Sequence, residues 1–299
     1  MNNIGEIAMI VACSNSLGIA AMVARRLKDR LVIPEKRVFP DGELYVRVPA
    51  EPDERAIVIN SLLPPQDRSF MELLLTVEAL RGMGVDDVTL VIPYMAYSRQ
   101  DKRFLPGEPI SLKVILETLS TLGASEIVTI DVHSEEGLRK IAKIKVTNLL
   151  PTREFAKYFK ERLNPRTVVL APDKGALKRA STLAGELGLD YDYIEKVRDR
   201  VSGEVKALPK EINVEDKDVL IVDDIISTGG TIALAARSIK ERGGKDIYAV
   251  CTHALLVHNA LDKIYESGVS EVIATDTVPS PVSKITIAPL IVEYLAKKY

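Results

Sequence analysis

The sequence predicts an α/β fold with two tandem domains, each built on a mostly parallel β-sheet flanked by helices. Two observations favour this class. Short runs of β-branched and aliphatic residues alternate with segments of helical spacing along the chain, which is the order expected of βαβ units. The same order occurs in both halves, and 299 residues suffice for two domains of ordinary size.

An internal repeat is clearest where a strand leads through a loop to a helix and a second strand. The first copy consists of strand 56–60, loop 61–68, helix 69–81 and strand 88–92. The second copy consists of strand 219–222, loop 223–230, helix 231–242 and strand 247–251. Because the order of elements is the same and glycines follow both helices, we interpret the chain as two related α/β halves.

The remaining elements follow the same alternation. In chain order they are the strand-like run 7–13, helix 112–122, strand 127–130, helix 153–163, strand 168–171, helix 176–187, strand-like 191–194, helix 259–266, strand 272–274 and helix 289–298. Pro151 interrupts the pattern before a new helix, which indicates a domain boundary there. We expect a first domain at 1–149 and a second at 150–288, with the last segment, 289–299, packing back on the first.

Composition excludes several classes of protein. Hydrophobic residues make up 46% and charged residues 27%, and no apolar run is long enough to span a membrane. A net charge of -2 with dispersed Lys and Arg argues against a nucleic-acid partner. Cys13 and Cys251, both in apolar strand-like segments, are predicted core residues and offer no disulfide framework. No signal peptide is visible, so a cytoplasmic location is expected.

The run 219–231 carries the strongest functional signal. Asp223 and Asp224 come at the carboxyl end of a buried strand, where parallel sheets bind ligands. The glycine-rich loop that follows, which leads into a helix and would favour a phosphate, consists of Ser227, Thr228, Gly229, Gly230 and Thr231. A Gly-Gly turn alone is more often simply a strand-to-helix turn. Adjacent carboxylates change this interpretation, because they repel each other without a cation or hydroxyl partner. The run therefore predicts a site for a phosphorylated sugar.

The corresponding loop of the first half lacks this chemistry. Asn60-Ser61 stands where Asp223-Asp224 stands, and Pro64-Pro65-Gln66-Asp67 replaces the Ser-Thr-Gly-Gly segment. We therefore expect only the second half to bind the sugar phosphate.

Other segments could carry chemistry, each with a structural alternative. The turn 38–43 is best interpreted alone as a simple turn between two strands. The charged loop 97–103 follows a buried strand and could clamp a polyphosphate, although a solvated loop fits nearly as well. His133 follows a strand beside Asp131, and a carboxylate at Asp173 comes just before a helix, as an N-cap or a metal contact. The segment 195–203 is an exposed hairpin or a closing lid.

Taken together, these segments resemble the ribose-phosphate diphosphokinase (PRPP synthetase) family, over nearly the whole chain and in the manner of archaeal members. The resemblance lies in Phe39-Pro-Asp-Gly-Glu43, Tyr97-Ser-Arg-Gln-Asp101, Asp131-Val-His133, Pro172-Asp-Lys-Gly175, Lys196-Val-Arg198 and Val222–Thr231. It implies two phosphoribosyltransferase-like domains, of which only the second keeps the sugar-phosphate loop. It also implies Mg²⁺-dependent transfer of the diphosphoryl group of ATP to the 1-hydroxyl of ribose 5-phosphate, giving PRPP and AMP.

The resemblance implies roles for individual residues. ATP would be bound by Phe39, Asp41, Gly42, Glu43, Arg99, Gln100 and Asp101, with the 39–43 loop reaching the active site of a neighbouring subunit in a homo-oligomer. His133 and Asp173 would serve Mg²⁺, and Lys196, Arg198 and His133 would act in catalysis, the two cations on a mobile loop. Ribose 5-phosphate would be bound by Arg198, Asp223, Asp224 and Ser227–Thr231.

The sequence departs from the family pattern at a few positions, and two other functions share some of its motifs. Many relatives have Asp where Ser227 stands and Gly where Ala176 stands, but neither change puts activity in doubt. The segment after His133 is shorter and more acidic than in bacterial and animal members, so their response to ADP and phosphate cannot be transferred. A phosphoribosyltransferase that consumes PRPP, or a non-catalytic regulatory partner, would not need all of the motifs above.

Overall fold

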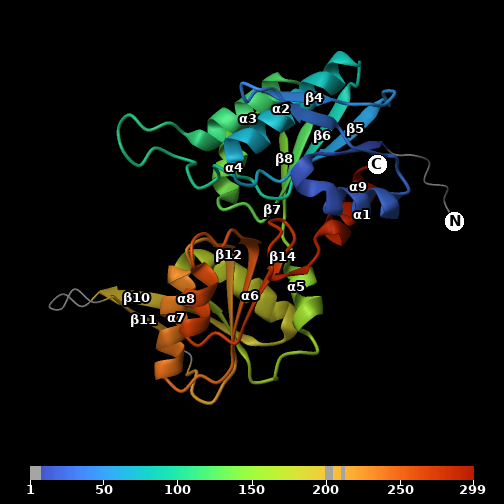
Figure 1. The fold of residues 1–299 in the computed structure, drawn as a ribbon. Helices are drawn as coiled ribbons and strands as arrows, with labels where there is room; N and C mark the ends of the chain where they lie inside the picture. The colour runs from blue at the N-terminus through green and yellow to red at the C-terminus, as the bar shows by residue number, and fades with distance from the viewer. Residues whose placement is uncertain (1–7, 199–204, 210–212) are drawn as a thin grey trace. The chain divides into compact units, whose positions relative to one another are not determined.

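A computed structural model describes residues 8–198, 205–209 and 213–299 (Figure 1). The chain divides into two compact units, Met1–Leu149 with Ile287–Tyr299, and Leu150–Thr286. Each unit holds a mainly parallel β-sheet with helices against its faces, so the predicted α/β class is confirmed.

The first unit contains a parallel sheet with the strand order β2-β1-β5-β6-β7-β8. Its strands are β1 (Met9–Ala12), β2 (Leu31–Val32), β5 (Arg55–Ile59), β6 (Asp87–Ile92), β7 (Glu126–Ile130) and β8 (Lys145–Leu149). A separate antiparallel hairpin consists of β3 (Glu35–Val38) and β4 (Leu44–Arg47). The hairpin packs on a helix: β4 lies against α2 (Gln66–Gly82).

Helices cover both faces of the first sheet. They are α1 (Leu17–Leu27), preceded by a short 3-10 turn at Ser14–Ser16, α2, α3 (Ser111–Thr121), α4 (Glu135–Ile141) and α9 (Ala288–Lys298). Helix α9 lies beside α1, and Ile291 and Leu295 are fully buried in one apolar cluster with Val23 and Ile57. The end of the chain thus completes the core of the first unit.

The second unit contains a sheet with the order β11-β10-β9-β12-β13-β14-β15. Its strands are β9 (Val168–Ala171), β10 (Asp190–Arg198), β11 (Val205–Pro209), β12 (Val219–Ile226), β13 (Ile247–Ala254), β14 (Glu271–Thr275) and β15 (Ser283–Ile285). The β10–β11 pair is antiparallel and the other pairs are parallel.

The strand β12 explains how this sheet is covered on both faces. Val219 and Ile221 pack into a cluster with helices α7 (Gly230–Glu241) and α8 (Ala260–Glu266). Leu220 and Val222 point the other way, into a cluster with α5 (Thr152–Phe159) and α6 (Leu177–Leu187). Because successive side chains of a strand alternate between faces, an uninterrupted β-branched run is what a doubly covered strand requires.

Several boundaries differ from the sequence-based expectations. Helix α2 begins at Gln66 instead of 69, and α5 ends at Phe159 instead of 163. Strand β10 continues to Arg198, well past the expected end at 194, because it pairs with β11. Helices α1 and α4 were not anticipated: α4 is only 7 residues long, whereas the buried residues of α1 recur at helical spacing and were a signal that the sequence analysis missed.

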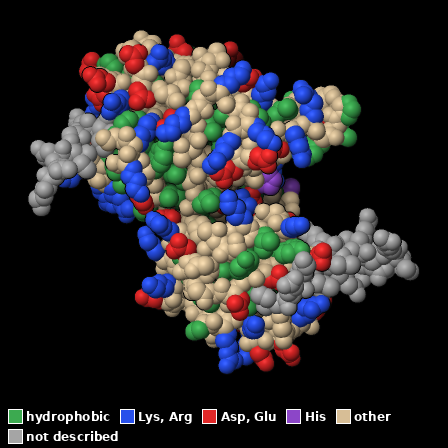
Figure 2. Space-filling model, turned by 180° about the vertical axis from the view of Figure 1, so that it is seen from behind, with side chains coloured by type: hydrophobic (Ala, Val, Ile, Leu, Met, Phe, Trp, Pro, Cys, Tyr) green, Lys and Arg blue, Asp and Glu red, His purple; other side chains and the backbone are tan. Residues whose placement is uncertain are grey.

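Charged side chains of both signs are interspersed over the face shown in Figure 2, in keeping with the small net charge. Over the described ranges, the structure contains no helix that is long and apolar enough to cross a membrane.

Candidate active site

Each sheet has one point where the chain switches direction, and ligands of open α/β sheets bind at such points. In the first sheet the chain runs outward from β1 to β2 on one side and from β5 to β8 on the other. In the second sheet the equivalent point lies between β9 and β12. The β9–β12 pairing ends at Ile221, although β12 itself continues alongside β13 to Ile226. Past Ile221 no described strand pairs with this edge of β12, so the gap in strand pairing at the switch point, the switch-point crevice, lies beside Asp223.

Asp223 and Asp224 lie within β12, not after its end as expected, and they face different surroundings. Asp224 is buried and pairs with Arg179 of α6, whose Nη2 lies 3.6 Å from Oδ2. Asp223 is partly buried and accepts a hydrogen bond from the backbone N–H of Asp224. Burial, and next the charge of Asp224, raise the pKa of Asp223 well above its ordinary value, while Arg179 opposes the rise. The pair is thus poised for a hydroxyl or cation partner.

The loop after β12 presents the amino end of α7. Gly229 occupies the N-cap position with φ of +72°, and no described side chain caps the helix. A Cβ atom at Gly229 would lie 2.9 Å from the carbonyl oxygen of Ala260, so both the turn and the packing against α8 require glycine. The first N–H groups of a helix have no intrahelical partner, which suits an anion. Hydroxyl groups of Ser227, Thr228 and Thr231 belong to the same loop and first turn.

The other predicted residues of the second unit lie on two neighbouring elements. Asp173 follows β9 and is exposed, and its Oδ1 accepts a hydrogen bond from the N–H of Gly175 at 2.9 Å. The N-cap interpretation is therefore confirmed. The backbones of Lys196 and Arg198 lie in β10, paired with Ala207 and Val205 of β11, which differs from the loop that the resemblance implied. Their side chains are outside the described part of the structure.

Side-chain hydrogen bonds from two serines hold the charged loop after β6 in place. Gln100 accepts a hydrogen bond from Ser111 at the start of α3, while Arg99 is exposed. Asp101 Oδ2 accepts a hydrogen bond from Ser134 Oγ at 2.5 Å. Ser134 is in turn the N-cap of α4, and its Oγ accepts a hydrogen bond from the N–H of Gly137. Asp101 thus ties the charged loop to the segment that follows His133.

His133 is exposed immediately after β7, beside the buried Asp131. The backbone at Asp131 has φ of +42°, in the left-handed region that non-glycine residues rarely adopt. The N–H of Asp131 donates to Leu149, and that of Val132 donates to the side chain of Asn148. Contacts with β8 therefore fix the turn that presents His133.

The turn 39–43 joins β3 to β4, as its interpretation as a turn between strands predicted. Phe39 N–H donates to Glu43, and Gly42 N–H donates to Phe39, with φ of +97° at Gly42. Asp41 Oδ1 accepts a hydrogen bond from the N–H of Glu43, so the carboxylate shapes the turn. Arg37 stacks on Tyr45 with its guanidinium carbon 4.2 Å from the ring centroid. The tip is exposed and preorganised.

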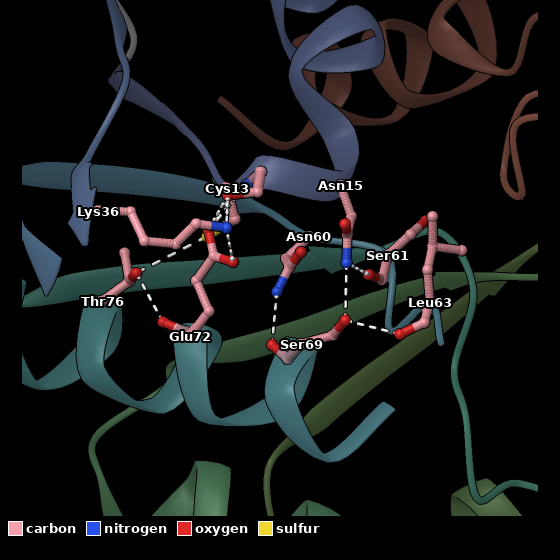
Figure 3. Close-up of polar contacts among 10 residues, drawn as sticks. Cys13, Asn15, Lys36, Asn60, Ser61, Leu63, Ser69, Glu72 and Thr76 are labelled. Atoms are coloured by element: carbon pink, nitrogen blue, oxygen red, sulfur yellow. Dashed lines mark hydrogen bonds and ion pairs between the residues drawn. The ribbon is translucent and has the colours of Figure 1, made fainter. Parts of the chain in front are cut away.

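The switch-point crevice of the first unit is filled by its own side chains (Figure 3). Asn60, at the position of Asp223, is fully buried and donates to the carbonyl oxygen of Ser69. Asn15 donates to the carbonyl oxygen of Ser61 and to Ser69 Oγ, which itself donates to Leu63. The polar groups of Asn15, Asn60 and Ser69 therefore bind neighbouring groups of the same unit, although Asn60 Oδ1 is buried without a hydrogen-bond partner among the described residues.

Two polar residues of the second unit escaped the sequence analysis. Arg179 lies on α6, far from the motif in sequence, and no local pattern links it to Asp224. His253 is buried at the end of β13, adjacent to Ile225 of β12, and its Nδ1 lies 2.9 Å from Thr277 Oγ1. Its place two residues past the expected strand 247–251 was the available signal.

The predicted residues offer few side-chain ligands for a divalent metal ion. Over the described residues, the side chains contain no group of three or more His, Cys, Asp or Glu that could hold a metal ion by itself. Magnesium usually keeps several waters and binds one or two carboxylates together with substrate phosphates. In the second unit the exposed carboxylate of Asp173, and in the first unit the exposed imidazole of His133, are each a group that can take part in such binding.

Comparisons with family models match both units. Residues 8–123 match the N-terminal domain of ribose phosphate pyrophosphokinase, and residues 145–283 match the phosphoribosyl transferase domain. The ribose-phosphate pyrophosphokinase of Methanopyrus kandleri is 41% identical over 287 residues, covering 95% of this chain and 97% of the relative. That of Methanothermobacter thermautotrophicus is 43% identical over 288 residues, covering 96% and 99%.

A solved structure agrees with the sequence comparisons. The phosphoribosylpyrophosphate synthetase from Mycobacterium smegmatis superposes with a TM-score of 0.87 at 28% identity, covering 97% of this chain and 98% of that chain. The likeness extends over both units and the order of their elements. With identities above 40% over nearly the full length of the archaeal relatives, the chain belongs to the ribose-phosphate pyrophosphokinase family.

Proposed function

We propose that this protein transfers the diphosphoryl group of ATP to the 1-hydroxyl of ribose 5-phosphate, giving PRPP and AMP with Mg²⁺ as the metal ion. One observation carries the assignment beyond family membership. The uncapped amino end of α7 lies next to Asp223 and Asp224 in the second unit, whereas the equivalent crevice of the first unit is filled. One sugar-phosphate site per chain is what the reaction needs.

Ribose 5-phosphate is placed with its phosphate at residues 227–231 and its hydroxyls at the carboxylate of Asp223. Asp224 supports Asp223 through its backbone N–H and keeps its own charge balanced by Arg179. This orientation leaves the 1-hydroxyl at the far end of the sugar, where it can attack the β-phosphorus. The bond from that phosphorus to the α-phosphate oxygen breaks, and AMP leaves.

ATP is assigned to groups of the first unit, of which the exposed ones are Phe39, Asp41, Gly42, Glu43 and Arg99 and the half-buried ones are Gln100 and Asp101. Asp173 and His133 would hold Mg²⁺ together with substrate oxygens, and the ion would neutralise charge on the transferring group. Lys196 and Arg198 would add two cations for the same purpose. Because positioning and charge neutralisation suffice for such transfers, no covalent nucleophile is needed.

The turn 39–43 is further proposed to act in the site of a neighbouring copy in a homo-oligomer. Complementation tests this proposal. Asp41→Ala and Asp223→Asn proteins, each inactive alone, should regain activity after their subunits are mixed and reassembled. Recovery would be absent if both residues served the active site of their own chain.

The reaction itself is tested by phosphorus NMR of the purified protein with ATP, Mg²⁺ and ribose 5-phosphate. AMP and a 1-diphosphorylated ribose should form in equal amounts, and Asp223→Asn should abolish both. Release of ADP in place of AMP would contradict diphosphoryl transfer. A protein that consumes PRPP together with a purine base, and that forms no PRPP from ATP, would instead be a phosphoribosyltransferase.

A further inference from the structure

Glu72 occupies the switch-point crevice of the first unit in the manner of a bound anion. This carboxylate, on α2, is 5% exposed and accepts hydrogen bonds from the N–H of Ser14 at 2.8 Å and from Ser14 Oγ at 2.7 Å. Lys36 Nζ lies 3.2 Å from its other oxygen and also contacts Ser14 Oγ. A loop N–H, a hydroxyl and a cation are the groups that would otherwise bind a phosphate.

The Glu72 carboxylate lies next to buried residues at the end of β1 and on α2. Cys13, at the end of β1, is fully buried, and its Sγ lies 3.7 Å from Thr76 Oγ1. Burial, and next the charge of Glu72, raise the pKa of Cys13 to about 12. The thiol therefore stays neutral, and Lys36 supplies the positive charge that balances Glu72 in this cluster.

Lys36 is the part of this cluster that belongs to the hairpin. It lies on β3 opposite Val46 of β4, so both side chains share the hairpin face that packs toward α2. Figure 3 shows the Lys36 side chain extending from its strand toward Glu72 and Cys13. The cluster therefore joins three elements: the end of β1, helix α2 and the hairpin.

The tip of the hairpin has a looser attachment than its base. A cavity of about 710 Å³ separates the tip from α2, with Gly42, Glu43 and Leu44 on one side and Arg68 and Met71 on the other. Phe39, Asp41, Gly42 and Glu43 are all exposed. Since the tip overhangs open space, its direction depends on how the base is held.

We propose that Glu72, acting through Lys36, is a positioning residue that fixes the direction of the β3–β4 hairpin and hence of its tip at 39–43. The proposal rests on the proposed function in one respect, namely that the tip contacts ATP. It predicts that breaking the Lys36–Glu72 contact weakens the use of ATP without affecting the ribose 5-phosphate site of the second unit.

Steady-state kinetics on the full-length protein test the positioning role. Lys36→Met should raise KM for ATP about tenfold, the change expected from losing one charge-assisted hydrogen bond. Both kcat and KM for ribose 5-phosphate should stay within about twofold. Lys36→Arg should restore most of the loss, and Glu72→Gln should reproduce it. The control is Glu35→Gln, which removes a charge from the same strand but breaks only the exposed pair with Arg47.

A second measurement separates this proposal from the assignment of the reaction. Hydrogen exchange of the hairpin amides, measured without substrates, should be faster in Lys36→Met than in the wild type and in Glu35→Gln. An unchanged KM for ATP in Lys36→Met, an equal rise in KM for ribose 5-phosphate, or unchanged exchange of the hairpin would overturn the proposal. A wild type that forms no PRPP would overturn the reaction instead, and the exchange result would still decide the role of Lys36.

Discussion

Replacing Arg179 by Met should impair the ribose 5-phosphate site although this residue lies outside every motif. The guanidinium is 21% exposed and lies 3.6 Å from the carboxylate of Asp224, which is 8% exposed. At an effective dielectric constant of about 20, a charge pair at this separation is worth about 5 kcal/mol before desolvation is subtracted. Without Arg179, the adjacent carboxylates of Asp223 and Asp224 would lose the positive charge that lies against Asp224.

Protonation limits how large the effect can be. Protonating a carboxylate of ordinary pKa at pH 7 costs about 4 kcal/mol. If the repulsion between the two carboxylates in the variant exceeded this cost, one of them would take up a proton instead. We expect kcat/KM for ribose 5-phosphate to fall about 100-fold at pH 7, equivalent to about 2.7 kcal/mol. Burial and the charge of Asp224 already raise the pKa of Asp223, and Arg179 opposes the rise. Its removal should raise this pKa further.

The sign of the pH dependence follows. Ribose hydroxyls bind best to charged Asp223, so activity falls as pH drops through the raised pKa. In Arg179→Met the fall should begin at a higher pH than in the wild type. The assay is a pH profile of kcat/KM between about pH 5.5 and pH 9. Arg179→Lys should retain most activity, and Lys178→Met, which removes the neighbouring exposed cation, should match the wild type. A wild-type profile in Arg179→Met would refute the reasoning.

Three further substitutions test the geometry. Gly229→Ala should abolish ribose 5-phosphate binding by calorimetry, because its Cβ would lie 2.9 Å from the carbonyl oxygen of Ala260 in a backbone with positive φ; retained affinity would contradict the requirement for glycine. Gly137→Ala should lower activity at least about tenfold while leaving ribose 5-phosphate binding intact, because its Cβ would lie 2.4 Å from Asp101 Oδ2; wild-type kinetics would exclude the Asp101 tether. Glu126→Gln should destabilise the packing of α9 by about 3 kcal/mol, measured by hydrogen exchange, and unchanged protection of that helix would contradict it.

The pKa of Glu126, which contacts α9, shifts in the opposite direction from that of Asp223. Burial alone would raise the pKa of Glu126, but hydrogen bonds from Lys298, Tyr294 and Lys145 outweigh it and hold the pKa below 4.5. The folded state therefore binds a proton less readily than the unfolded chain. The stabilisation is fully present above pH 4.5 and is lost as pH falls through the lowered pKa. Protection of α9 should decline in acid more in the wild type than in Glu126→Gln.

The sequence predicted what is local and periodic. The apolar residues of β12 are consecutive, so the sequence predicts a strand covered on both faces. The phosphate site that we predict at 227–231 also depends only on the residues of that loop. Arg179 could not be found this way, since its ion pair with Asp224 joins a helix to a strand that follows it much later in the chain. The extension of β10 to Arg198 also escaped prediction, because charged residues carry no apolar alternation and pairing with β11 determines the strand.

The two switch points differ in where their charged groups lie, which is the reason that we assign the ligand site to the second unit alone. In the second unit, the negative groups Asp223 and Asp224 belong to the strand, and the N–H groups of α7 have no described side chain to cap them. In the first unit, the carboxylate belongs to the helix, and Glu72 reaches the loop after β1 from within α2. A carboxylate held there satisfies the loop donors and would repel an incoming phosphate. The same carboxylate binds Lys36, and this is the contact that we propose orients the hairpin.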